Sequence, residues 1–144
     1  MSKLLRMLLA VVVGFVLGSV VNMALITVSG KVIPPPAGAD VTTMEGLKAS
    51  LHLFEARHFI FPFLAHALGT LLGALVACWL APGKSHVPAY IVGGLFLLGG
   101  ITSSFMLPAP AWFVAADLLL AYLPTAWIGQ ALAKRSPSGS ARGA

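Results

Sequence analysis

The sequence predicts an all-α membrane protein: a four-span transmembrane helical bundle with an amphipathic helix in one long outside loop. Two observations carry this prediction. Of the 144 residues, 58% are hydrophobic and 9% are charged, whereas about 25% of the residues of a soluble domain are charged. Four apolar runs are also long enough to cross a bilayer, which takes about 20 helical residues. This composition excludes a soluble enzyme, a disordered chain and a nucleic-acid-binding domain.

The predicted spans cover residues 4–29, 59–81, 88–107 and 111–133. Prolines lie at several of their ends, as is usual for a residue that starts or stops a helix. The first apolar run is longer than the apolar core of a signal peptide, which has roughly 7–15 residues, so we expect an uncleaved helix. A single domain is predicted over residues 1–135, and the Ser/Gly-rich residues 136–144 are expected to form a disordered tail.

The positively charged residues predict the orientation, because cytoplasmic loops carry an excess of Lys and Arg. If both termini are cytoplasmic, the inside carries Lys3, Arg6, Lys84, Lys134, Arg135 and Arg142, and the outside carries Lys31, Lys48 and Arg57. We therefore expect a multi-pass protein of the cell (inner) membrane with both termini in the cytoplasm and residues 30–58 outside.

The outside segment contains signals for a helix at the membrane surface. Thr42-x-x-Glu45 is typical of a capping box, which would start a helix at this point. Apolar residues then recur at helical spacing, with polar residues between them. These apolar residues are Met44, Leu47, Leu51 and Phe54. The pattern predicts an amphipathic helix that lies on the membrane or covers the end of the bundle.

Polar residues occur at matched depths in the apolar spans. Each span has a stripe of small residues, of the kind that lets membrane helices pack closely, and a polar residue lies on or beside each stripe. At 1.5 Å per residue, Asn22, His66 and Asp117 lie roughly 10 Å below the outer boundary, and Ser103 and Ser104 lie at about half that depth. We expect these side chains to converge in the outer half of the bundle.

Asp117 is the strongest candidate for a functional residue. A carboxylate in hydrocarbon costs roughly 2.5–3.5 kcal/mol on insertion scales and usually faces a partner or a cavity. His66 is its natural partner, since an imidazole can keep the carboxylate ionised or share its proton. Pro124 should kink the fourth span, and the nearby Tyr122 hydroxyl would extend the polar path. A buried pair that only joins two helices explains the same residues.

A second group, His52-x-x-Glu55-x-x-His58, gives weak candidates for metal or haem ligands if the three residues share a helix face. A polar face on the predicted amphipathic helix explains them more simply. The single cysteine, Cys78, excludes an intrachain disulfide and a Cys-based zinc site. The sequence identifies no cofactor.

Three functions are compatible with these residues. The first is binding or transport of a small or lipid-like ligand, or of protons, at an outward-facing site around His66 and Asp117. The second is a non-catalytic subunit of a membrane complex or homo-oligomer, packing through the small-residue stripes. An intramembrane enzyme with Ser103 or Ser104 as nucleophile ranks third, because the chain has no nucleophile-elbow motif. The expected partners are the lipid bilayer and a second copy or a larger membrane complex, with no nucleic acid.

Overall fold

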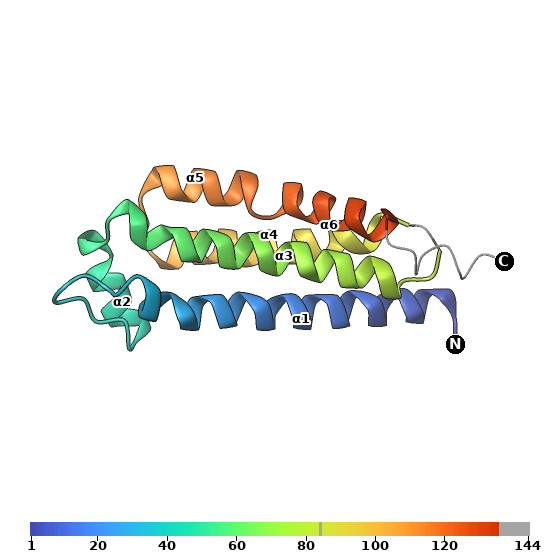
Figure 1. The fold of residues 1–144 in the computed structure, drawn as a ribbon, viewed down its shortest axis with the longest axis horizontal. Helices are drawn as coiled ribbons and strands as arrows, with labels where there is room; N and C mark the ends of the chain where they lie inside the picture. The colour runs from blue at the N-terminus through green and yellow to red at the C-terminus, as the bar shows by residue number, and fades with distance from the viewer. Residues whose placement is uncertain (84, 136–144) are drawn as a thin grey trace.

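The computed structural model describes residues 1–83 and 85–135, which form an all-helical bundle (Figure 1). Its long helices are α1 (Lys3–Val32), α3 (Ile60–Leu80), α4 (Val87–Met106), α5 (Ala111–Leu120) and α6 (Leu123–Arg135). Four helical segments are long and apolar enough to cross a membrane, with α5 and α6 together forming the fourth. The prediction of four membrane-length helices is confirmed. The predicted disordered tail, residues 136–144, and Lys84 lie outside the described residues.

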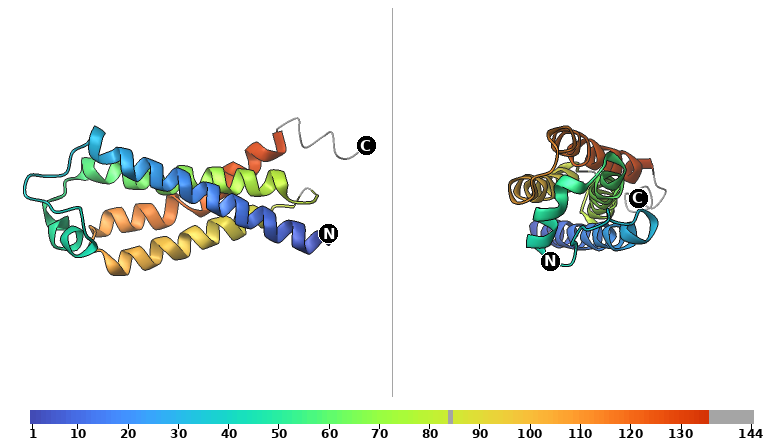
Figure 2. Two further views of the ribbon diagram at one scale, coloured as in Figure 1. Left: turned by 90° about the horizontal axis from the view of Figure 1, so that it is seen from below. Right: turned by 90° about the vertical axis from the view of Figure 1, so that its left-hand side faces the viewer.

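Helix α1 packs against α3 through glycines. Figure 2 shows the two helices crossing each other. A Cβ atom on Gly14 would meet the carbonyl oxygen of Gly73, and one on Gly18 would meet the carbonyl oxygen of Gly69. The backbones are therefore in direct contact, which only glycine permits.

Helix α3 lies at the centre of the bundle, where it contacts α1, α4 and α6. Its neighbours approach through small residues here too, since a Cβ atom on Gly129 would meet the carbonyl oxygen of Leu71. Fully buried alanines fill much of the interior: Ala65, Ala74, Ala77, Ala89 and Ala126. Large apolar side chains such as Leu98, Phe105 and Leu119 are exposed. This inversion of the usual soluble pattern suits a bundle whose outer surface meets lipid.

The fourth apolar segment is broken between α5 and α6. Pro124 has no N–H to donate, which removes one backbone hydrogen bond. The next side chain also bonds the backbone at this point, because the one hydroxyl hydrogen of Thr125 is shared between the carbonyl oxygens of Ala121, at 2.6 Å, and Tyr122, at 3.0 Å. A helix break thus lies beside Pro124, where the sequence predicts a kink, and it places the Tyr122 side chain in the interior with 1% of its surface exposed.

The start of the short helix α2 (Met44–Ser50) differs from the prediction by one residue. Thr43, not Thr42, caps this helix, because its hydroxyl oxygen accepts the amide hydrogen of Gly46 at 2.9 Å. The hydroxyl and amide of Thr42 donate to Asp40, and these two hydrogen bonds lower the pKa of the Asp40 carboxyl. The Asp40 amide in turn donates to the Ser50 hydroxyl. These contacts fold the outside segment back on itself.

The α-helix within residues 30–58 ends at Ser50, so Leu51 and Phe54, two of the four apolar residues that predicted an amphipathic helix, lie beyond it. After α2 the chain forms two short 3-10 turns, η1 (Leu51–Leu53) and η2 (Ala56–Phe59), with extended backbone at Phe54 and Glu55. The reason is packing. Leu51, Phe59 and Phe113 form a buried apolar cluster with Phe54 beside it, and a straight helix could not bring them all together at the start of α5.

Candidate functional site

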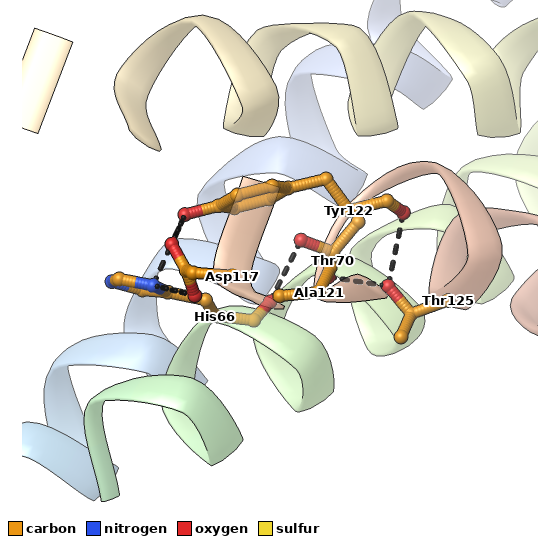
Figure 3. A network of polar contacts seen from close by, with 6 residues as sticks. All are labelled: His66, Thr70, Asp117, Ala121, Tyr122 and Thr125. Carbon is orange, nitrogen blue, oxygen red and sulfur yellow. Dashed lines mark hydrogen bonds and ion pairs between the residues drawn. The ribbon is translucent and has the colours of Figure 1, made fainter. Parts of the chain in front are cut away.

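Three polar side chains from different parts of the chain meet inside the bundle (Figure 3). The Nδ1 atom of His66 lies 2.8 Å from Oδ1 of Asp117 and 3.0 Å from the hydroxyl oxygen of Tyr122. The Tyr122 hydroxyl donates to Oδ2 of Asp117 at 2.7 Å. We call these three residues the Asp–His–Tyr network. It satisfies both carboxylate oxygens, as a buried charged or polar group requires.

The elements around the network fix each side chain. His66 lies on α3, and its own carbonyl oxygen accepts the hydroxyl hydrogen of Thr70 one turn later, at 2.7 Å. Asp117 lies on α5, before the helix break, and Tyr122 lies in the break itself. A Cβ atom on Gly100 of α4 would overlap the Tyr122 ring. The glycine therefore leaves room for this ring to lie against α4.

The hydrogen bonds indicate how the network shares its protons. The hydroxyl hydrogen of Tyr122 goes to Asp117, so an ionised Asp117 requires the Nδ1 atom of His66 to carry the hydrogen that faces it. In a neutral imidazole this leaves Nε2 as an acceptor, and in a charged imidazole it is a second donor. The side chain of Asp117 is 6% exposed, whereas that of His66 is 24% exposed. The histidine is the accessible member of the network.

A cavity of about 180 Å³ adjoins the exposed part of His66. Asn22 of α1, Ser103 of α4 and Tyr122 also line it, and Phe15 and Phe96 supply apolar wall, their ring centroids 5.0 Å apart. Its volume is somewhat larger than the roughly 150 Å³ of an engineered cavity that binds benzene. The cavity therefore has space for one small ring or a chain of a few atoms.

Asn22 supplies an unsatisfied group. Its Oδ1 atom is buried and has no hydrogen-bond partner among the residues that the structure describes. A buried acceptor left in this state costs about 1–3 kcal/mol. Asn22 lines the same cavity as His66, and its unpartnered oxygen atom is itself buried.

The structure places most, but not all, of the predicted site residues at or beside the cavity. Asn22, His66, Ser103 and Tyr122 line the cavity, and Asp117 lies behind His66. Ser104 is not part of this group, because its hydroxyl donates to the carbonyl oxygen of Ile101 in its own helix, at 2.7 Å.

Sequence reasoning missed Phe15, Phe96 and Thr70. The two phenylalanines line the cavity, and Thr70 donates to the backbone of His66. Nothing in the sequence distinguishes the two phenylalanines from other apolar residues of these helices. Thr70 had one sequence signal, its position one turn after His66.

The weak metal candidates are not arranged as ligands. Nδ1 of His58 accepts the Glu55 amide hydrogen at 2.9 Å, Glu55 forms an ion pair with Arg57 at 3.0 Å, and Nδ1 of His52 contacts the Ala49 carbonyl oxygen. Over residues 1–83 and 85–135, no three His, Cys, Asp or Glu side chains are grouped to hold a metal ion. The extended backbone at Phe54 and Glu55 takes His52 out of the helical register that it would otherwise share with Glu55 and His58.

The fold and site thus define an all-helical protein with four membrane-length helices and a buried Asp–His–Tyr network between them. Comparison of the chain with protein-family models, curated proteins and solved structures gives no match. The chemistry of the site must therefore be argued from its own geometry.

Proposed function

We propose that this chain is a small polytopic inner-membrane protein that binds a small or lipid-like ligand in the cavity beside His66. The observation that carries the proposal is that Asn22, whose buried Oδ1 atom has no hydrogen-bond partner among the described residues, lines the same cavity as His66. A network that served only to join helices would need neither the cavity nor the unsatisfied acceptor. Binding sites combine an apolar wall with a few placed polar groups, as this cavity does.

The polar groups define the ligand by its chemistry. Asn22 calls for a hydrogen-bond donor, and Phe15 and Phe96 favour an apolar body. Asp117 and Tyr122 hold His66 with Nδ1 protonated, which directs Nε2 to the ligand. The ligand we expect is a compact apolar molecule, or the end of a lipid-like one, that carries a hydroxyl or amine. Contacts between an imidazole and a carboxylate also occur in the proton relays of membrane proteins, so the proposal includes coupling of binding to a proton.

This ligand chemistry can be tested with a pair of probes that differ only in the donor. We expect 4-fluorophenol to bind about tenfold more tightly than 4-fluoroanisole, because one hydrogen bond to a buried acceptor is worth about 1.4 kcal/mol. Asn22→Leu should remove this preference, whereas Thr27→Leu should keep it, since Thr27 is an exposed residue of α1 whose hydroxyl bonds its own helix. Fluorine NMR titration of the purified protein measures the affinities. Equal binding of both probes to the wild type contradicts the proposal.

We place the site in the outer half of the membrane, with both termini cytoplasmic. One support is the asymmetry in the distribution of Lys and Arg. A second is that the start of α1 and the end of α6 lie on the same side of the bundle, opposite α2 (Figure 1).

Cysteine labelling tests this topology. In a Cys78→Ala background, a membrane-impermeant maleimide added outside intact cells should modify Ala37→Cys and leave Ser85→Cys unlabelled. Both positions are exposed in the folded chain, so access to the reagent depends on the side of the membrane. Permeabilised cells, in which both cysteines should react, provide the control. Labelling of Ser85→Cys alone in intact cells would reverse the orientation.

The other two functions have less support. The glycines of α1 and α3 that suggested an accessory subunit are used for contacts within the chain. An intramembrane enzyme would need a nucleophile on His66, and in the described part of the chain no hydrogen bond joins Ser103 to that imidazole.

A further inference from the structure

A second cavity, of about 390 Å³, lies between the start of α4 and the end of α6. This is the end of the bundle at which α1 also begins, opposite α2 (Figure 1). It is separate from the cavity beside His66, and no residue lines both. Four kinds of group line the second cavity: two cations, two aromatic rings, a histidine and a glutamine. They are Lys134, Arg135, Tyr90, Trp127, His86 and Gln130.

The charge of this cavity is entirely positive. The chain has only four acidic residues, of which three lie in residues 30–58 and the fourth is Asp117. Within the described residues, the ion pairs are Arg57 with Glu55 and His66 with Asp117. Lys134 and Arg135 therefore face the cavity without a neutralising carboxylate from the described chain, and the cavity attracts an anion.

A polar pair, buried Gln130 and exposed His86, forms part of the wall. Gln130 is 5% exposed, and its Nε2 amide group contacts Nδ1 of His86. An amide donates to that ring nitrogen, which leaves the hydrogen of a neutral His86 on Nε2. The wall thus offers imidazole and amide groups in addition to the two cations. The amides at the start of α4 do not add to it, because Val87 is capped by the Ser85 hydroxyl and Ala89 bonds to the His86 carbonyl.

The aromatic rings favour a ligand located at a membrane surface. Tyr90 and Trp127 are exposed at the same end of the bundle as Lys134 and Arg135. Amphipathic rings prefer the headgroup level of a bilayer, and basic pockets between helices at this level bind anionic headgroups. A ring beside a cation also provides apolar contact for the glycerol part of a lipid.

We propose that this cavity binds an anionic phosphate group, carried by a membrane phospholipid. Lys134 and Arg135 neutralise the phosphate, and Tyr90 and Trp127 contact the adjoining part of the headgroup. The proposal does not depend on the function of the Asp–His–Tyr network. It requires only that this end of the bundle reaches the membrane surface.

Native mass spectrometry of the protein in an uncharged detergent tests the proposal with phosphatidylglycerol, and with phosphatidylcholine as the zwitterionic comparison. Lys134→Gln/Arg135→Gln should weaken phosphatidylglycerol binding by about 30-fold, since each basic residue near an anionic surface contributes about fivefold. Both side chains are exposed, so the variant should fold. Lys31→Gln/Lys48→Gln removes the same charge from exposed positions in the first 50 residues, and it should bind phosphatidylglycerol like the wild type.

Two further experiments complete the test. The first distinguishes binding in the cavity from attraction by surface charge alone, and the second distinguishes a bound lipid from free phosphate. Trp127→Leu should weaken phosphatidylglycerol binding several-fold although no charge is lost. Millimolar inorganic phosphate, compared with sodium chloride of equal ionic strength, should not displace the lipid, and displacement would assign the site to a free phosphate group instead. An equal loss of binding in both double-glutamine variants, or no loss in Trp127→Leu, would overturn the proposal.

Discussion

Gly73→Leu is expected to destabilise the folded protein by about 3 kcal/mol, at the upper end of the usual cost of overpacking. A Cβ atom on Gly73 would lie 2.8 Å from the carbonyl oxygen of Gly14 and 3.1 Å from Cγ1 of Val92. The neighbour in closest contact is backbone, which cannot rotate away, so α1 and α3 would have to separate. Thermal unfolding in detergent, followed by circular dichroism, measures the effect.

Gly94→Leu provides the matched control for this variant. Gly94 is also a mid-helix glycine, but a Cβ atom there has nothing within 4 Å. Leucine has a higher helix propensity than glycine, by roughly 1 kcal/mol at most, so this control should be neutral or slightly more stable. If both variants unfold at the wild-type temperature, the contact between α1 and α3 contributes nothing to the stability of the bundle.

Asp117→Asn is expected to keep the fold and to reduce binding of 4-fluorophenol at least tenfold. An amide is nearly isosteric with the carboxylate, and interhelical hydrogen bonds in membranes are modest, so the stability cost should be about 1–2 kcal/mol. The amide has only one acceptor oxygen, whereas Asp117 accepts from both His66 and Tyr122. The imidazole then loses the partner that fixes its protonated nitrogen. Fluorine NMR measures the binding, and nitrogen-15 NMR of labelled histidine reports which ring nitrogen is protonated.

Tyr122→Phe separates the carboxylate from the rest of the network. This variant removes one donor to Asp117 but keeps the contact of 2.8 Å between His66 and Asp117, so His66 should stay protonated at Nδ1. Binding of 4-fluorophenol should fall less than in Asp117→Asn. Wild-type affinity in Asp117→Asn, with the modest loss of stability described above, would mean that the network only joins helices.

The sequence was sufficient for the features that depend on composition and periodicity. Apolar runs located the four long helices, and matched depth in the second and fourth runs paired His66 with Asp117, whose side chains do meet. The cost of a charge in an apolar helix limits its possible neighbours, so few partners had to be considered. Pro124 likewise indicated an interruption, because its effect on a helix is local.

Features that depend on tertiary contacts could not be predicted. The segment after Ser50 has helical spacing, yet Phe54 and Glu55 are extended because Leu51 and Phe59 pack against Phe113 at the start of α5. The cavity beside His66 was equally hidden, since nothing in the local sequence places Phe15 near Phe96. Contacts between residues far apart in the sequence determine both features, and the periodicity within one segment contains no information about such contacts.

The length of α1 has a consequence for the membrane around the protein. Its 30 residues extend about 45 Å, whereas the 20 residues of α4 extend about 30 Å. The first length matches a whole bilayer with its headgroups, and the second matches the hydrocarbon layer alone. If the chain spans a bilayer as we propose, α1 is long enough to place Lys3 and Lys31 in opposite headgroup layers. In a thinner membrane, α1 would have to tilt to keep its apolar residues in the hydrocarbon layer. Because its glycines contact α3 directly, this tilt would also shift the helix that carries His66.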